Sequence, residues 1–358
     1  MVGACYLDTI LTVDHYPDED EKLRASSVRR RRGGNCPNSV EVFQQLLDSS
    51  PEHNEISLNL AAVLPARSSV GSQQIKASFG PRVNLQHCIY REAFNEPASS
   101  YIIKSQSTGS RTIVNYNELP EMTVAEFVQI ADQLVRTTDD WFHFEASSLL
   151  VLFIPHSTAV YLLTDPLQGR IPDVTLQCMQ YLRQRHPAVR ISVEVEKPGR
   201  AGLQELAAGA DVVFYAKGWA QANGYRSPEE FLRAQAQLTP KARYLCCTWG
   251  EEGAAIMDLA DRNTPTYEST PAYTVAHGQV VEYVEPISSL KDCVLTLKYS
   301  TIGAGDTFIA GMLYSLLCHP DDWDLSRKLR FANELAGRKV FQEGFTGLGD
   351  AMRHHFES

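Results

Sequence analysis

The strongest constraint on the fold of this chain is a regular alternation of short β-branched runs with longer amphipathic segments. In the middle of the chain, strands are predicted at residues 141–144, 189–195, 211–215 and 244–248, and helices at 174–185, 203–208 and 228–237. Strands that alternate with helices are typical of a parallel sheet, because a crossover helix is needed to return the chain to the edge where the next strand begins. The pattern therefore predicts a layered α/β protein with a mostly parallel sheet.

Both ends of the chain extend this pattern. A first strand is predicted at residues 2–7 with Asp8 at its end, and the turn Thr108-Gly109-Ser110 is predicted to join two further strands, at residues 98–103 and 111–116. Further helices are predicted at residues 38–47, 124–135, 306–317 and 325–341. No repeat and no linker rich in Pro, Gly or Ser interrupts the chain, so we expect one domain spanning residues 1–358.

Composition and charge argue against several classes of protein. The 358 residues are 44% hydrophobic and carry a formal net charge of −10, whereas nucleic-acid-binding proteins present a basic surface. The eight cysteines form no C-x-x-C pair and lack zinc-ligand spacing, which favours reduced thiols in the cytoplasm. No apolar run reaches the roughly 20 residues that span a bilayer, and no signal peptide is found. We therefore expect a cytoplasmic protein that binds neither nucleic acid nor membrane.

The sharpest local motif is Gly303-Ala304-Gly305-Asp306, which leads directly into the predicted helix at 306–317. Two glycines allow a tight turn whose N–H groups can approach a ligand, and a helix N-terminus favours an anion there. A carboxylate held beside such an anion hole suits phosphoryl transfer, in which a base takes the proton of the attacking hydroxyl. An ordinary glycine turn capped by Asp explains the same residues, so the motif alone leaves both interpretations open.

A second motif, Gly33-Gly34-Asn35-Cys36-Pro37-Asn38, precedes the predicted helix at 38–47 and offers amide donors and acceptors to a polyol. In this order the two motifs resemble the two signatures of the PfkB, or ribokinase-type, carbohydrate kinases. Further segments extend the resemblance over most of the chain and are most similar to the ketohexokinase branch of that family. They are Asp14-His15-Tyr16-Pro17, Gly109-Ser110-Arg111-Thr112, Phe142-His143-Phe144-Glu145, Val193-Glu194-Val195-Glu196-Lys197-Pro198 and Thr248-Trp249-Gly250-Glu251-Glu252-Gly253.

The resemblance implies a fold and an activity. The fold is a ribokinase-like three-layer α/β sandwich with a mostly parallel central sheet and a small β-sheet lid, here roughly residues 9–35 and 98–118. The activity is ATP-dependent phosphorylation of a sugar hydroxyl, with a ketohexose such as fructose as the expected substrate. The implied cofactors are ATP and Mg²⁺, with K⁺ as a further candidate ion. The implied assembly is a homodimer formed through the lid, in which Asp20 reaches the sugar site of the partner.

The resemblance also implies a role for each matched residue. Asp306 is the expected catalytic base, and Gly303, Ala304 and Gly305 are expected to form the anion hole. The expected sugar-binding residues are Asp8, Asp20, Gly34, Asn35, Asn38, Arg111 and Glu145. The expected ATP-binding residues are Lys217, Thr248, Gly250, Glu252, Gly253 and Gly305, and the expected residues near Mg²⁺ are Glu194 and Glu196. Plainer interpretations remain for several of these, such as a turn residue at a strand end for Asp8 and a solvated lid arginine for Arg111.

The chain departs from the family in three places. Tyr215-Ala216-Lys217-Gly218 replaces an Asn-x-x-Glu motif, so an acid expected near the metal is missing. Two segments without a family counterpart, residues 146–168 and 283–300, interrupt core positions, and the second puts Ser300 where the family has Asp. Codons for Glu282-Tyr283-Val284 and for Ser300 can spell a splice donor and acceptor. The segments are therefore interpreted either as translated introns or as lineage-specific loops.

Three other functions are alternatives to a ketohexokinase-like activity. A kinase of ribose or adenosine would share the fold, and a catalytically impaired sugar-binding relative would explain Ser300. A Rossmann dehydrogenase is disfavoured, because the glycine turn lies near the C-terminus and no acidic residue follows at ribose distance. The basic run at residues 29–32 is interpreted as a strand of the lid, with a nuclear-import patch as the alternative.

Overall fold

A computed structural model describes residues 1–50, 53, 55–137, 140–145, 171–276, 279–282 and 302–356. These residues form two compact units. The first unit comprises residues 1–122, 251–253 and 270–358, and the second comprises residues 123–250 and 254–269. A single domain spanning the whole chain stays a prediction, and the two unmatched segments at 146–168 and 283–300 lie outside the described residues.

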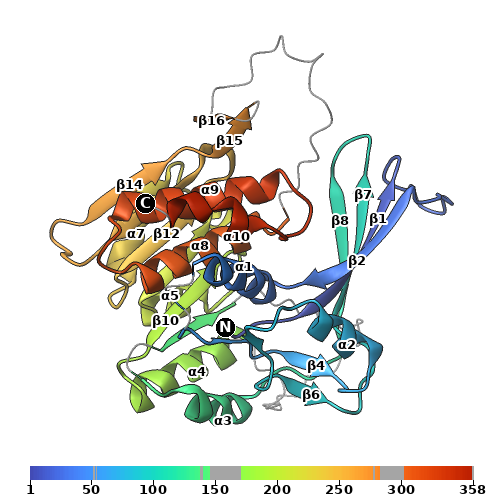
Figure 1. The fold of residues 1–358 in the computed structure, drawn as a ribbon, viewed down its shortest axis with the longest axis horizontal. Helices are drawn as coiled ribbons and strands as arrows, with labels where there is room; N and C mark the ends of the chain where they lie inside the picture. Colours follow the sequence, from blue (N-terminus) through green and yellow to red (C-terminus); the bar gives the residue numbers. More distant parts are fainter. Residues whose placement is uncertain are drawn as a thin grey trace, which may run out of the picture. The chain divides into compact units, whose positions relative to one another are not determined.

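The second unit is built on a six-stranded sheet with the order β14-β13-β12-β11-β10-β9 (Figure 1). Four of these strands are parallel neighbours: β9 (Trp141–Phe144), β10 (Arg190–Val195), β11 (Val212–Ala216) and β12 (Tyr244–Thr248). The strand β13 (Ala254–Asp258) runs antiparallel to β12, and β14 (Thr266–Thr270) forms the edge. The interior strands are almost continuous buried runs, as expected for a parallel sheet covered by helices. The predicted parallel sheet is therefore confirmed.

One helix precedes β9, and others return the chain between the parallel strands. They are α3 (Val124–Leu134), α4 (Ile171–Arg185), α5 (Leu203–Gly209), α6 (Lys217–Ala222) and α7 (Pro228–Leu238). The side chain of Ser227 accepts a hydrogen bond from the Glu230 N–H, with Pro228 at the first helical position, so α7 begins where its cap predicts. Thr123 and Glu126 form a capping box that starts α3.

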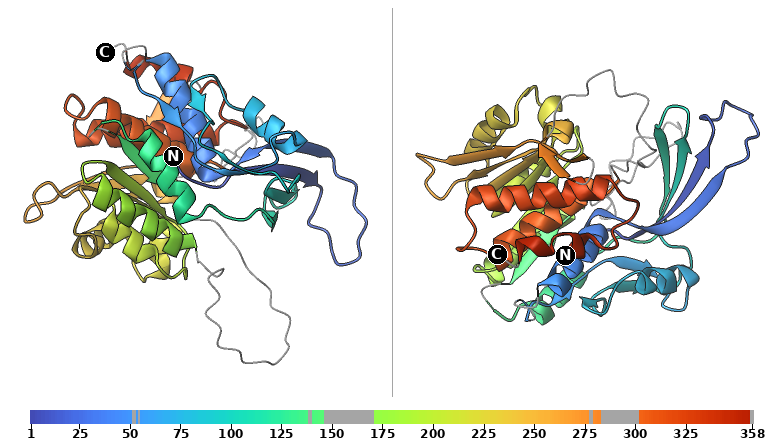
Figure 2. Two further views of the ribbon diagram at one scale, coloured as in Figure 1. Left: turned by 90° about the horizontal axis from the view of Figure 1, so that it is seen from below. Right: turned by 45° about the horizontal axis from the view of Figure 1, so that its top comes forward.

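The first unit contains a four-stranded sheet with the order β2-β1-β7-β8. Its strands are β1 (Tyr6–Val13), β2 (Ser27–Gly33), β7 (Ser99–Ser105) and β8 (Arg111–Tyr116). Figure 1 and the right view of Figure 2 show the β1–β2 and β7–β8 hairpins side by side. The sheet covers the residues predicted for the lid, and Arg29–Arg32 lie in β2 as expected. The predicted strand at residues 2–7 is wrong, because pairing with β2 and β7 carries β1 on to Val13. Asp8 is therefore the third residue of β1 and not its end.

The rest of the first unit is mainly helical. The helices α1 (Asn35–Ser49), α8 (Ala304–Cys318), α9 (Leu325–Val340) and α10 (Leu348–Ala351) pack together, and α8 is buried along nearly its whole length. Residues 58–91 add short elements that the sequence did not predict: β3 (Leu58–Asn59), β4 (Val63–Pro65), α2 (Val70–Ala77), β5 (Val83–Asn84) and β6 (Ile89–Arg91). A further hairpin joins β15 (Tyr273–Ala276) to β16 (Gln279–Glu282). Within the described part of the chain, no helix is both long and apolar enough to cross a membrane.

Candidate active site

The glycine turn before α8 has the geometry that the motif predicts. Gly303 is the N-cap residue with φ +83°, a left-handed conformation that favours glycine. A Cβ atom there would lie 2.5 Å from Cζ of Phe345, so the close approach of this ring also requires glycine. Ala304 and Gly305 are the first two residues of the helix, and Asp306 follows in its first turn. The N–H groups at this helix start therefore form a site suited to an anion, with a carboxylate beside it.

Asp306 is buried and held by residues from α1. The Nδ2 amide of Asn38 donates to Oδ2 of Asp306 at 2.7 Å, and the Ser39 hydroxyl donates to the backbone carbonyl of Asp306 at 2.9 Å. The two motifs, 268 residues apart for Asn38 and Asp306, thus meet in the first unit. An amide N–H on one oxygen of the carboxylate sets its orientation and leaves the charge in place.

Arg32 fixes the orientation of the Asn38 amide. Its Nη1 donates to Oδ1 of Asn38 at 3.0 Å, which leaves Nδ2 to donate to Asp306. The guanidinium also donates to Glu41 and to Ser78 Oγ and lies over the Phe79 ring, 4.6 Å from its centroid. The Arg32 side chain is only 2% exposed, whereas that of Arg29 in the same strand is 50% exposed. Arg32 is therefore a positioning residue for Asp306 through Asn38.

Lys339, near the end of α9, is a second buried cation in this region. Burial lowers the pKa of its ammonium from 10.5 to about 8, and the positive charge of Arg31 acts in the same direction, while Asp306 opposes the shift. Its Nζ donates to the carbonyl of Gln342 at 3.1 Å and lies 5.4 Å from the centroid of the Phe345 ring. Lys339 therefore adds positive potential close to Asp306 at neutral pH.

The lowered pKa of Lys339 predicts a pH-dependent stability. Between pH 8 and 10.5 the folded lysine loses its proton while the unfolded one keeps it, so the unfolded state binds more protons and stability rises with pH. We expect the unfolding free energy of the unmodified protein to rise by up to about 3 kcal/mol relative to Lys339→Met across this window. Urea unfolding at several pH values measures it, with the exposed Lys241→Met as the matched control. Parallel curves for the unmodified protein and Lys339→Met would contradict the prediction.

Asp8 lies in a row across the four-stranded sheet. Its register partners are Arg31 in β2 and Ser100 in β7, and Nε of Arg31 lies 3.4 Å from Oδ2 of Asp8. Burial raises the pKa of Asp8, while Arg31 and the Ser100 hydroxyl act to lower it. Gly33 is required beside this carboxylate, since a Cβ there would lie 2.5 Å from Oδ1 of Asp8. A buried carboxylate with a cation and a hydroxyl around it is suited to accepting hydrogen bonds from a sugar.

The remaining sugar-site residues of the first unit lie in three different places. Gly34 precedes α1 with φ +106°, and a Cβ there would lie 2.1 Å from the carbonyl oxygen of Ala4, so position 34 cannot carry a side chain. Asn35 is the first residue of α1. Arg111 pairs with Lys104 at the tip of the β7–β8 hairpin, four register steps from the row of Asp8, or about 13 Å along the strands. Asp20 is exposed in the β1–β2 connection, with φ +65°. The sheet therefore does not bring Arg111 beside Asp8.

The nucleotide-site candidates of the second unit follow two neighbouring parallel strands. Ala216 ends β11 opposite Thr248, the last residue of β12, and Lys217 then begins α6. Nζ of Lys217 lies 5.8 Å from the centroid of the Trp249 ring. Gly250 begins the short 3₁₀ helix η2 (Gly250–Glu252), and the candidates Glu252 and Gly253 belong to the first unit. Ligands of open α/β sheets bind at the carboxyl ends of the strands, so this edge suits an anionic nucleotide.

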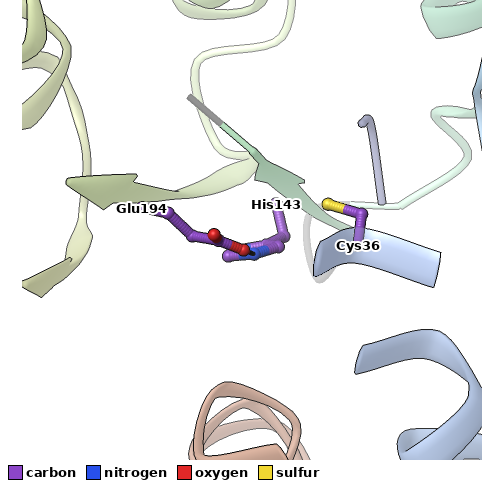
Figure 3. A group of neighbouring side chains, drawn as sticks. All are labelled: Cys36, His143 and Glu194. Carbon is purple, nitrogen blue, oxygen red and sulfur yellow. Dashed lines mark hydrogen bonds and ion pairs between the residues drawn. The ribbon is translucent and has the colours of Figure 1, made fainter. Parts of the chain in front are cut away.

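Glu194 and Glu196 differ in their surroundings. Glu194 is buried in β10, and its Oε1 lies 3.0 Å from Nε2 of His143 (Figure 3), whereas Glu196 follows the strand and is exposed. Burial lowers the pKa of His143 to about 3, so this imidazole is neutral. The Trp141 indole donates to Ser192 Oγ at 2.9 Å, and Ser192 lies 2.9 Å from Nδ1 of His143. The result is a hydrogen-bonded relay that runs from Trp141 through Ser192 and His143 to Glu194, in which each group donates to the next.

The hydrogen-bonded relay that ends at Glu194 does not suit the role near Mg²⁺ expected for this residue. Mg²⁺ keeps several waters and takes oxygen ligands, whereas the Glu194 carboxylate is 3% exposed and accepts from an imidazole. Glu196 stays a candidate, and Glu145 follows β9 as a buried carboxylate. The neighbouring Lys197 has a lowered pKa through burial, which Glu196 and Glu145 oppose, so these three charges lie near one another at the carboxyl edge.

Arg32, Lys339 and His143 were missed by the sequence reasoning. Arg32 stands in a run of four arginines, and the run itself gave no sign that only one of them is buried and orders Asn38. Lys339 reads as an ordinary cation at a helix C-terminus. His143 gave no recognisable signal, because a single histidine in an apolar strand belongs to no specific motif.

Comparison with known proteins agrees with these observations. The sequence profile described as "pfkB family carbohydrate kinase" matches residues 294–348, which include the glycine turn and α8; the match begins inside the segment 283–300. A mouse ketohexokinase is 30% identical over 349 residues, covering 97% of each chain.

Solved structures show the same fold. The Arabidopsis thaliana ribokinase, determined with ribose and ATP, superimposes with a TM-score of 0.64 at 15% identity, covering 100% of this chain and 97% of that one. The Methanocaldococcus jannaschii nucleoside kinase gives a TM-score of 0.63 at 16% identity, with 99% and 96% covered. The predicted ribokinase-like α/β fold is confirmed, and the extent of the match to the mouse enzyme shows that this chain belongs to the PfkB family of carbohydrate kinases, phosphotransferases that act on a sugar hydroxyl.

Proposed function

We propose that this protein transfers the γ-phosphoryl group of ATP to a hydroxyl of a ketohexose such as fructose. The observation that carries the proposal is the buried carboxylate of Asp306 at the N-terminus of α8, next to the left-handed Gly303 and oriented by Asn38. The 30% identity to a ketohexokinase over nearly the whole chain supports the ketohexose as acceptor.

In the proposed reaction Asp306 accepts the proton of the attacking sugar hydroxyl. A positioned base of this kind contributes about 10²–10⁴-fold to the rate. The amides of Gly303, Ala304 and Gly305 stabilise charge on the transferring phosphoryl group. The sugar is bound by Asp8, Gly34 and Asn35. Asn38 donates to Asp306 and so orients the base, and Arg32 in turn orients the Asn38 amide. Lys217 and the Thr248–Gly253 loop bind the nucleotide. Mg²⁺ would accompany ATP, and we assign no step to it, because Glu194 does not fit as its ligand.

A substrate panel tests the proposal. ADP release is measured with ATP and, in turn, fructose, ribose, adenosine or no acceptor. We expect release with fructose to exceed all the others. If ribose or adenosine were the preferred acceptor, the assignment of a ketohexose would be wrong but that of a kinase would stand. Sugar binding without turnover would identify a catalytically impaired relative.

We also propose that the protein dimerises through the four-stranded sheet of the first unit. The strand β8 is exposed along its whole length and carries Ile113 and Val114, 48% and 59% exposed, and β7 adds Tyr101 at 50%. Val114 and Tyr101 are register partners and share one face of the sheet, and exposed apolar side chains on one face are typical of an interaction surface. Val114→Glu should shift the sedimenting species from dimer to monomer in ultracentrifugation, and Asp20→Asn should leave the dimer intact but weaken sugar binding. A monomeric unmodified protein with full activity would overturn the proposal.

The two unmatched segments, 146–168 and 283–300, are proposed to be translated introns. Removal of the first segment would join Glu145 to Gly169. The second splice would fall inside codon 282 and use the last base of codon 300, so Glu282 would become the Asp of Val280-Val281-Asp-Thr301 before the glycine turn. We expect the fused chain to melt higher and turn over faster, because protein cores have no spare volume for extra apolar segments. Thermal unfolding and sugar-dependent ADP release measure both effects. A full-length chain that is more stable and more active than the fused one would show that the segments are genuine structure.

A further inference from the structure

Near the C-terminus, three potential metal ligands converge from two elements of the first unit. Glu334 lies in α9, and His354 and His355 are adjacent in the short helix η3 (Arg353–His355). Nε2 of His355 lies 3.0 Å from Oε2 of Glu334, and Nε2 of His354 lies 3.3 Å from Oε1. One ligand atom from each residue can be chosen so that all three lie within 4.8 Å of one another.

These separations match a metal coordination shell. Ligand atoms bound at about 2.0–2.1 Å in a tetrahedron lie roughly 3.3 Å apart. The two N···O distances, 3.0 and 3.3 Å, are close to this value but go to different oxygens of Glu334. An ion would therefore bind both oxygens, or draw both imidazoles toward one of them through small rotations of the side chains. Two imidazoles and one carboxylate form a donor set that suits zinc and other late first-row ions better than Mg²⁺ or Ca²⁺.

The neighbours of the cluster hold its side chains in place. Arg338 donates through Nε and Nη2 to Oε1 of Glu334, at 2.8 and 2.7 Å, which orients the carboxylate with Oε2 toward His355. The Phe331 ring packs edge-on against the His355 ring at 5.3 Å, and Arg327 donates to the His355 carbonyl. Carboxylates that bind metals are commonly hydrogen-bonded behind the coordinating atom in this way. The positive charge of Arg338 weakens the attraction for a cation without removing it.

The ionisation states also suit a metal. Burial lowers the pKa of His354, and His355 acts in the same direction, so this imidazole is readily neutral. The pKa of Glu334 is lowered: burial acts to raise it, but hydrogen bonds from His355 and Arg338 outweigh burial, so the carboxylate is ionised. A neutral imidazole and an ionised carboxylate are the forms in which these side chains bind metals.

We propose that Glu334, His354 and His355 bind one divalent transition-metal ion of the zinc class and thereby tie η3 to α9. An ion held only by the folded state raises its stability, so the site would clamp the end of the described chain. This inference does not depend on which sugar the enzyme phosphorylates.

The test is titration of the full-length protein with ZnCl₂ by calorimetry at pH 7.5, without nucleotide or Mg²⁺, together with Co²⁺ absorption as a report of coordination geometry. We expect one saturable equivalent in the unmodified protein, tetrahedral Co²⁺ bands and a Zn²⁺-dependent rise in melting temperature. His354→Gln, His355→Gln and Glu334→Gln should each lose all three signals. His186→Ala should keep them, because it removes a histidine of the second unit, whose Nε2 lies 3.3 Å from Asp132.

His354→Gln keeps the test decisive if Glu334→Gln unfolds the protein, because the His354 side chain is 53% exposed and its replacement leaves the pairing of Glu334 with Arg338 intact. Absence of saturable Zn²⁺ binding in the unmodified protein would overturn the proposal. Binding that survives in His354→Gln and His355→Gln together would place the metal elsewhere and overturn it equally.

Discussion

The Asp306→Asn variant is expected to lose phosphoryl transfer while keeping its fold. Removal of a general base costs about 10²–10⁴-fold in kcat, or roughly 3–5 kcal/mol of barrier. Asparagine has nearly the same shape as aspartate, and its carbonyl oxygen can still accept the hydrogen bond that Asn38 donates. The loss should therefore appear in kcat, with a melting temperature close to that of the unmodified protein.

A matched control comes from another aspartate at a helix start. Asp324 caps α9, its side chain accepting from the Arg327 N–H, and no glycine turn precedes it. Asp324→Asn should leave kcat unchanged. Sugar-dependent ADP release by the two variants, together with thermal unfolding, separates a catalytic role from helix capping. If Asp306→Asn retained near-normal kcat, the assignment of Asp306 as the base would be wrong.

The Arg32→Met variant is expected to lower stability by about 3–5 kcal/mol, the usual cost of removing one partner of a buried ion pair. The change leaves the Glu41 carboxylate without the guanidinium that now lowers its pKa against the effect of burial, and it leaves Oδ1 of Asn38 without its donor. With that donor gone, the Asn38 amide can rotate away from Asp306, so kcat should fall as well. Urea unfolding and steady-state kinetics measure the two effects.

Two further variants separate the structural and catalytic parts of this effect. In the double variant Arg32→Met with Glu41→Gln no unpaired carboxylate remains, so much of the lost stability should return. Its kcat should stay low, because Asn38 still lacks Arg32. Arg30→Met, an exposed arginine of the same strand, is the matched control and should change neither quantity. A normal kcat in the stable double variant would show that Arg32 does not position the site.

Local patterns of sequence were enough to predict the parallel sheet and the glycine turn. The strands β9 and β12 have the predicted bounds, and α7 begins at the predicted Ser227-Pro228 cap. These features depend on residues that are neighbours in the chain: an apolar run, a capping side chain, or a glycine with no Cβ. Their physical causes can therefore be recognised without knowing what packs against them.

Features that depend on distant partners were decided only by the tertiary structure. β1 continues past Asp8 because two other strands pair with it, although aspartate disfavours strands locally. Asn38 meets Asp306 across 268 residues, and no spacing rule connects them. The side chains of Arg29, Arg31 and Arg32 are 50%, 23% and 2% exposed although they share one short run. Burial of a charge depends on the elements that close over it, so the sequence determined which residues could form the site and packing determined which of them do.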